Sequence, residues 1–237
     1  MAAKQKKNVK EQQKKKSMMI AGAVVLCFCI VAALIFVFMN PKESTSDQVD
    51  ENMNQTDENT DQAADDHADL SGNCYADIEI QDYGTITVQL DQASAPITTE
   101  NFINLAESGF YDGLTFHRIM EGFMMQGGDP QGNGMGGSDQ TIVGEFSDNG
   151  YDNDLSHTRG AISMARSNDY NSASSQFFIV HQDSKFLDGQ YAVFGYVTEG
   201  IEIVDQICES AEPTDNNGTI PAEKQPVITK ITIRTEE

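Results

Sequence analysis

Cysteine is scarce in this chain, and its scarcity excludes a disulfide-stapled scaffold. Of the four cysteines, Cys27 and Cys29 lie inside a long apolar run, and Cys74 and Cys208 lie beyond it. Two cysteines outside that run do not make a disulfide framework. A single bridge between Cys74 and Cys208 stays open, because sequence alone does not place two thiols within bonding distance.

Positive charge is also scarce, which argues against nucleic acid as a partner. The chain has 15 lysines and arginines against 37 aspartates and glutamates, for a formal net charge of -22. Proteins that bind nucleic acid need clustered cations that neutralise phosphates. Seven of the lysines fall within residues 1–16, so the rest of the chain is even more acidic, and it contains only four arginines.

An apolar run follows the basic tail of residues 1–16. No charged residue occurs between Met18 and Met39, and about 20 apolar residues suffice to cross a bilayer as a helix. A cleaved signal peptide is the alternative, but its apolar region spans roughly 7–15 residues and ends at a small-residue site, which "FVFMNPKE" does not offer. We therefore predict a transmembrane signal-anchor helix at residues 17–39 that contacts the lipid bilayer.

The lysines orient this predicted anchor. Positively charged flanks stay in the cytoplasm, so residues 1–16 form a cytoplasmic tail and the chain is a single-pass protein of the cell membrane with an extracytoplasmic C-terminal part. Residues 40–73 contain ten acids and one lysine and too little apolar surface to fold, so they predict a disordered linker. Residues 74–237 are long enough to form one domain with a core.

The sequence of residues 74–237 predicts many short strands and two helices. "ADIEIQDYGTITVQL" alternates as a β-hairpin, and "VITKITIRTEE" reads as a final strand. Helices are predicted after Pro96, with a stop at Gly109, and over "GIEIVDQICESA". The remaining strand-sized pieces are "LTFHRIM", "FMMQGG", "TIVGEF", "GAISMAR", "SQFFIVH" and "YAVFGYV". This pattern is typical of a mainly β fold, a closed antiparallel barrel with helices covering its ends.

Several reaction classes lack their signatures. "GNGMGG" fits a dinucleotide pattern, but a strand-like segment follows it where a helix is required, so we interpret it as a tight loop. The sequence has no G-x-S-x-G elbow. His117, His157 and His181 lack metal-ligand spacing and read as structural histidines. We expect neither a metal nor another cofactor.

One arginine stands out among apolar neighbours. Arg118 lies close in sequence to Phe123, Met124 and Met125, with no carboxylate beside it. A partly buried guanidinium needs an acceptor. The acceptor is either a structural partner elsewhere in the chain or a ligand, and the sequence pattern alone permits both.

Three segments resemble the cyclophilin family of peptidyl-prolyl cis–trans isomerases: "FHRIMEGFMMQGGDP", "ISMAR…SSQFFIVH" and "FLDGQYAVFGYV". The resemblance covers about residues 76–234 and suggests a membrane-anchored, bacterial-like form. It implies an eight-stranded antiparallel barrel capped by two α-helices, with the site on its outer face. By the same resemblance Arg118 is catalytic, and the substrate is held by His117, Phe123, Met124, Gln126, Ala165, Arg166, Gln176, Phe178, Phe186, Leu187 and Tyr191.

This chain departs from the family pattern at three of those positions. Phe186 stands where many members have tryptophan, Tyr191 where many have histidine, and Arg166 where many have asparagine. The expected function is isomerisation of X–Pro bonds in proline-containing segments of unfolded or secreted proteins, by a monomer. The alternative is a membrane-tethered module or holdase that binds proline peptides without turning them over.

Overall fold

The computed structural model describes residues 73–236. The expected tail at 1–16, the anchor at 17–39 and nearly all of the linker at 40–73 therefore lie outside the described residues. In the described part, the elements in chain order are β1 (Asn73–Ile80), β2 (Gly84–Leu90), α2 (Pro96–Glu107), β3 (Thr115–Met120), β4 (Met124–Asp129), η1 (Ser147–Asn149), β5 (Ala161–Met164), β6 (Phe177–Val180), η2 (Lys185–Leu187), β7 (Val193–Glu199), α3 (Ile201–Ser210), η3 (Ala222–Lys224) and β8 (Ile228–Glu236).

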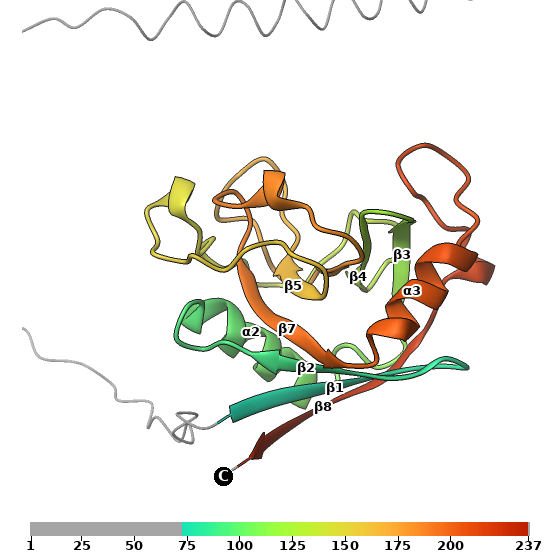
Figure 1. The fold of residues 1–237 in the computed structure, drawn as a ribbon, viewed down its shortest axis with the longest axis horizontal. Helices are drawn as coiled ribbons and strands as arrows, with labels where there is room; N and C mark the ends of the chain where they lie inside the picture. The colour runs from blue at the N-terminus through green and yellow to red at the C-terminus, as the bar shows by residue number, and fades with distance from the viewer. Residues whose placement is uncertain (1–72, 237) are drawn as a thin grey trace, which may run out of the picture. The chain divides into compact units, whose positions relative to one another are not determined.

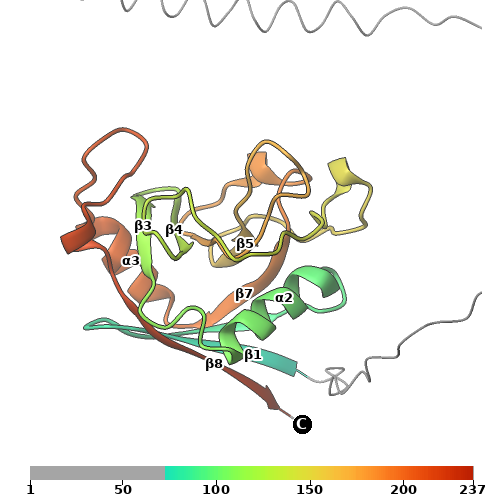
Figure 2. The ribbon, with the colours of Figure 1, turned by 180° about the vertical axis from the view of Figure 1, so that it is seen from behind.

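The strands form one curled antiparallel sheet (Figures 1 and 2). Its eight strands follow the order β3-β4-β6-β5-β7-β2-β1-β8. The outermost strand β3 is bridged at two places: Thr115 pairs with Val227, just before β8, and Arg118 pairs with Thr219 in the connection between α3 and η3. Within the described residues these single bridges take the place of a continuous ladder. The mainly β prediction is confirmed, and the expected closed barrel is a curled sheet whose edges are joined over a short stretch, where Ile228 also exchanges backbone hydrogen bonds with Gly113 and Leu114.

The first hairpin forms as its alternation predicts. Ile78 faces Ile86 across β1 and β2, and both side chains are fully buried. Asp82 in the connecting turn takes a positive φ of 65°, which aspartate tolerates better than most residues. The turn therefore returns the chain without disturbing the apolar face.

Two helices pack against the sheet, at opposite ends of the long β1, β2 and β8 strands (Figures 1 and 2). Helix α2 begins at Pro96, whose missing N–H is harmless at that position, and ends before Gly109, which has a φ of 73°. Helix α3 buries Ile203, Val204 and Ile207, as its spacing predicts. Both helix predictions are confirmed.

One expected strand does not form. "TIVGEF" contributes a single bridge, between Ile142 and Ala173, and is otherwise irregular. Side chains take the backbone groups of Gly144 that a ladder would use: its N–H donates to Asn171 Oδ1, and its oxygen accepts from Asn149 Nδ2. The segment is therefore held by side chains at this point and not by a strand partner.

The core has two apolar clusters on opposite faces of the sheet. Phe177 belongs to the larger cluster beneath α2 and Phe178 to a smaller one with Met124 and Val193, because adjacent strand residues face opposite ways. In the described residues Cys74 and Cys208 are buried free thiols, so no bridge joins them. Among residues 73–236, no helix has the length and apolar character to cross a bilayer.

Candidate active site

A cavity of about 120 Å³ opens on the outer face, over the smaller cluster. Nine of the twelve residues that the sequence proposed for the site line it. They are Arg118, Phe123, Met124, Gln126, Ala165, Arg166, Phe178, Leu187 and Tyr191. A cavity of this size suits a single small ring, such as that of proline, rather than a whole cofactor.

Strand register brings the central residues together. Arg118 on β3 pairs with Gln126 on β4, and Gln126 pairs with Phe178 on β6. Directly paired residues on antiparallel strands point to the same face. A guanidinium, an amide and an aromatic ring therefore form one row across three neighbouring strands.

Among residues 73–236, the guanidinium of Arg118 is held without an ion pair. Its Nε donates to the backbone oxygen of Asn217 at 2.7 Å, one Nη donates to Gln126 Oε1 at 3.1 Å, and the other contacts the sulfur of Met120 at 3.4 Å. Burial lowers the pKa of Arg118, with Tyr191 and Asp215 opposing that shift. Arginine stays charged even so, and several of its N–H groups remain for an acceptor from outside.

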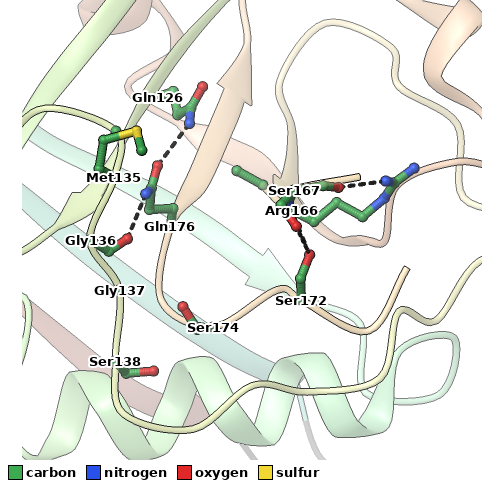
Figure 3. A pocket seen from close by; sticks show the side chains of 12 residues that line it. Gln126, Met135, Gly136, Gly137, Ser138, Arg166, Ser167, Ser172, Ser174 and Gln176 are labelled. Carbon is green, nitrogen blue, oxygen red and sulfur yellow. Dashed lines mark hydrogen bonds between the residues drawn. The ribbon is translucent and has the colours of Figure 1, made fainter. Parts of the chain in front are cut away.

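A directed hydrogen-bond chain runs on from Arg118, and Figure 3 shows its last two bonds. Gln126 accepts from the guanidinium and donates its own amide to Gln176 Oε1 at 2.9 Å. Gln176 then donates to the backbone oxygen of Gly136 at 2.7 Å. Because arginine has no acceptor atoms, each amide along the chain has only one workable orientation.

A buried histidine packs against the aromatic side chains that line the cavity. The His157 ring is stacked against Phe178, with centroids 5.9 Å apart and planes 13° apart, and lies edge-on to Tyr191. Its Nδ1 lies 2.8 Å from Asp188 Oδ1 and its Nε2 lies 3.1 Å from Ser163 Oγ. Ser163 is fully buried, so this Ser-His-Asp arrangement is sealed from substrate and is structural.

Three predicted residues lie outside the cavity lining. His117 is buried and points away from the face that carries its neighbour Arg118, and both of its ring nitrogens lack a partner among the described residues. Phe186 is 66% exposed and packs on Phe123 with ring centroids 5.6 Å apart. Gln176 reaches the site through its bond to Gln126.

A second cavity of about 340 Å³ adjoins the first (Figure 3). The two share Gln126, Ala165 and Arg166 as lining residues. The glycine-rich loop at 134–137 borders the second cavity, and Asp129 fixes that loop by accepting hydrogen bonds from the N–H groups of Gln131, Asn133 and Gly134. The loop is tight, as the sequence predicts, and it forms a wall of this second cavity.

Arg166 separates the two cavities. Its guanidinium carbon lies 4.5 Å from the Tyr191 ring centroid, 4.8 Å from that of Tyr170 and 5.2 Å from that of Phe146. Nε and one Nη both donate to the backbone oxygen of Gln190. Figure 3 shows this guanidinium turned away from Gln126 and Gln176, so Arg166 lines both cavities while its guanidinium packs among the aromatic rings.

Comparison with known proteins decides the family. The family model for cyclophilin type peptidyl-prolyl cis-trans isomerases matches residues 75–234. The chain is a cyclophilin. The cyclophilins are peptidyl-prolyl cis–trans isomerases, and this cyclophilin is accordingly an enzyme of that class.

Bacterial relatives carry the same name. The chain is 46% identical over 123 residues to peptidyl-prolyl cis-trans isomerase B of Bacillus subtilis, covering 52% of this chain and 82% of that protein. It is 44% identical over 140 residues to peptidyl-prolyl cis-trans isomerase A of Dickeya dadantii, covering 57% of this chain and 70% of that protein. The isomerase domain therefore accounts for most of each relative.

A solved structure supports the fold as well. The crystal structure of a Cryptosporidium parvum cyclophilin type isomerase, determined in the presence of the dipeptide Ala-Pro, superposes with a TM-score of 0.60 at 30% identity. The match covers 68% of this cyclophilin and 99% of that chain. The matched part is thus a complete cyclophilin domain.

Sequence reasoning missed the residues that support the site from behind. His157 was interpreted as structural without a link to Phe178, and neither Asp188 nor Asn217 was singled out. The only available signal was the position of Asp188 directly after Leu187 in "FLDGQ". Asn217 lies 99 residues from Arg118, a separation at which no local pattern operates.

Proposed function

We propose that this cyclophilin rotates X–Pro peptide bonds by using Arg118 to stabilise the twisted amide. Rotation is slow because nitrogen shares its lone pair with the carbonyl, which gives a barrier of ~18–20 kcal/mol. In the twisted state that lone pair returns to nitrogen. A positioned N–H donor therefore stabilises the transition state more than the planar ground state.

The observation that carries this proposal is the Arg118 guanidinium at the cavity rim, which has no carboxylate partner in the part of the chain that the structure describes. Asn217, Gln126 and Met120 hold it, while further N–H groups remain for the substrate carbonyl and the proline nitrogen. No covalent bond is made or broken in the rotation, so the proposed step requires neither a nucleophile nor a cofactor.

The apolar residues of the cavity hold the proline ring. Met124 and Phe178 are 1% and 5% exposed and form the floor, with Phe123 and Leu187 at the sides. Such a wall holds the proline ring while the preceding carbonyl swings. It also lowers the local dielectric, which strengthens the interaction with the guanidinium.

The competing hypothesis is a module that binds proline segments without turnover. The same cavity would serve it, but a pure binder has no need of a preorganised charge beside the ring. Turnover of a proline tetrapeptide by the full-length chain separates the two hypotheses. We expect catalysed exchange at low enzyme concentration, whereas measurable binding with no rate would select the binder.

We further propose that the enzyme acts outside the cytoplasm on secreted or unfolded chains, tethered by residues 17–39. The support is the uncharged run that follows seven lysines. Expression of the full-length chain in bacteria, followed by protease treatment of spheroplasts, tests this arrangement. We expect the isomerase domain to be digested from outside and the chain to sediment with membranes; protection from protease would contradict the orientation.

A further inference from the structure

The connection between α3 and η3 contains a turn that is organised by one carboxylate. Asp215 Oδ1 accepts hydrogen bonds from the N–H groups of Asn217 at 3.0 Å and Thr219 at 3.1 Å. Its Oδ2 accepts from the Thr219 hydroxyl at 2.9 Å. An aspartate that bonds several backbone groups ahead of it fixes a turn in one conformation. The Asp215–Thr219 turn is therefore preformed, although it is exposed to solvent.

This turn is attached to β3 on both sides of Arg118. The N–H of Ile119 donates to the oxygen of Gly218 at 2.8 Å, and the N–H of Ile220 donates to the oxygen of His117 at 3.0 Å. Gly218 has a φ of 88°, and a Cβ atom there would lie 2.5 Å from Met120 Cγ. Only glycine satisfies both the conformation and the close approach. The turn and the strand thus fit together in a single way.

The attached turn presents one carbonyl to the site. Arg118 Nε donates to the oxygen of Asn217 at 2.7 Å, the shortest of the three bonds that hold this guanidinium. A guanidinium is planar, so fixing Nε on one side and an Nη on Gln126 on the other sets the plane of the whole group. Without the Asn217 carbonyl, only the Gln126 side chain and the weakly accepting sulfur of Met120 would orient the guanidinium.

We infer that Asp215 is a positioning residue for catalysis, which acts by holding the Asn217 carbonyl where Arg118 Nε requires it. Asp215 lines neither cavity, so it acts through Arg118 and not on the substrate. The inference rests on the proposed role of Arg118. A purely structural role for Asp215 would change stability but leave the chemistry of the folded enzyme intact, and the experiment below separates the two.

The test compares Asp215→Ala and Asp215→Asn in the full-length chain. We expect Asp215→Ala to lower kcat about tenfold or more, because small misplacements of a catalytic group carry large rate penalties, with KM nearly unchanged. Asparagine keeps an oxygen that accepts from the backbone, so Asp215→Asn should restore most of the rate. Asp91→Ala is the matched control, since Asp91 Oδ1 accepts from the N–H of Ser94 at 2.9 Å in a turn away from both cavities.

Two further readouts report on Arg118 itself. In ¹⁵N-labelled protein, the Arg118 Nε–H resonance should shift and broaden in Asp215→Ala, because its acceptor is no longer fixed, while Asp91→Ala leaves it in place. In an Arg118→Ala background, Asp215→Ala should add no further loss, since non-additivity is the signature of residues that act through one another. Thermal melts identify any variant that fails to fold, and rates and spectra are compared at a temperature where every variant is folded.

The outcomes separate the inference from the function on which it rests. An inactive Arg118→Ala together with an Asp215→Ala enzyme of normal kcat and unshifted Nε–H resonance would overturn the inference and leave the proposed mechanism standing. A fully active Arg118→Ala enzyme would overturn both. A lower kcat, a shifted resonance and non-additivity together support the positioning role.

Discussion

The ring of His157 lies stacked behind Phe178, 5.9 Å away and 13° from parallel. His157 is completely buried, and its Nδ1 and backbone N–H both contact Asp188 Oδ1. Asp188 directly follows Leu187, another residue of the cavity wall. One histidine therefore fixes two walls of the cavity, and the shape of the cavity depends on a side chain that does not line it.

Phe178 should dominate substrate binding. Truncation to alanine removes an apolar ring worth about 1.5–3 kcal/mol when buried, so we expect KM to rise about tenfold or more while kcat falls less. Phe178→Leu, which keeps most of the side-chain volume, should lie between alanine and wild type. Titration of an Ala-Pro peptide followed by NMR measures the affinity. Unchanged peptide affinity in Phe178→Ala would contradict the assignment of this wall.

Two of the three histidines buried among the described residues, His117 and His157, make stability depend on pH. Burial lowers the pKa of His117 and of His157 below the ordinary 6.5. The unfolded chain then binds more protons than the folded one once the pH falls below that value, so stability is lost towards acid and retained above it. We expect the melting temperature to decrease as the pH falls from 7.5 to below 6. In His117→Phe, which has lost one of the two histidines, the melting temperature should decrease less over the same pH range.

His117→Phe also tests the unpartnered ring nitrogens. Both nitrogens of His117 are buried without a partner among the described residues, so replacing them with carbon removes a desolvation cost. We expect equal or greater stability at pH 7.5, measured by urea unfolding. A clear loss of stability at that pH would show that the histidine makes a favourable polar contact, for example with a bound water molecule.

Arg166 should brace Tyr191 through its planar shape. Lysine keeps the charge but neither stacks among three rings nor shares one carbonyl between two N–H groups. We expect Arg166→Lys to raise KM several-fold through a loosened cavity wall, with kcat changed less. Arg234→Lys is the control, because Arg234 also lies over a tyrosine ring, 4.6 Å from the centroid of Tyr75, but outside both cavities. Equal effects of the two substitutions on KM would count against the brace.

Glu145 should matter for stability alone. It is 2% exposed, and its two oxygens accept from the N–H groups of Ile97 and Thr98 in the first turn of α2. Those N–H groups have no partner within the helix. We expect Glu145→Ala to reduce the free energy of unfolding by about 1–3 kcal/mol, with the exposed Glu223→Ala as control. A loss of kcat/KM in the folded variant would refute a role confined to the helix start.

The sequence predicted those features of the fold and the site that are controlled by local sequence patterns. Pro96 and Gly109 marked the limits of α2, the alternating isoleucines marked the first hairpin, and three motifs marked Arg118, Gln126 and Phe178. In each case the signal lies within a few residues of the element that it predicts. Nine predicted residues line one cavity. The strand register aligns three of them, and the smaller cluster gathers all of the others except Arg166.

The contacts that the sequence did not predict join segments that lie far apart in the chain. Glu145 contacts a helix 47 and 48 residues away, and Asn217 contacts Arg118 across 99 residues. No periodicity links such positions. "TIVGEF" failed for a related reason, since its alternation favours a strand but the side chain of Asn171, 27 residues away, accepts from the N–H of Gly144 in place of a strand partner.

The central claim is that Arg118 stabilises the twisted prolyl amide, and exchange NMR on an Ala-Pro peptide in the presence of full-length enzyme tests it most directly. Arg118→Ala should abolish most catalysed exchange while peptide affinity and melting temperature change little, and Arg118→Lys should recover only part of the rate. Arg234→Ala, which removes a remote arginine, should exchange as fast as wild type. Wild-type exchange by Arg118→Ala would contradict the account.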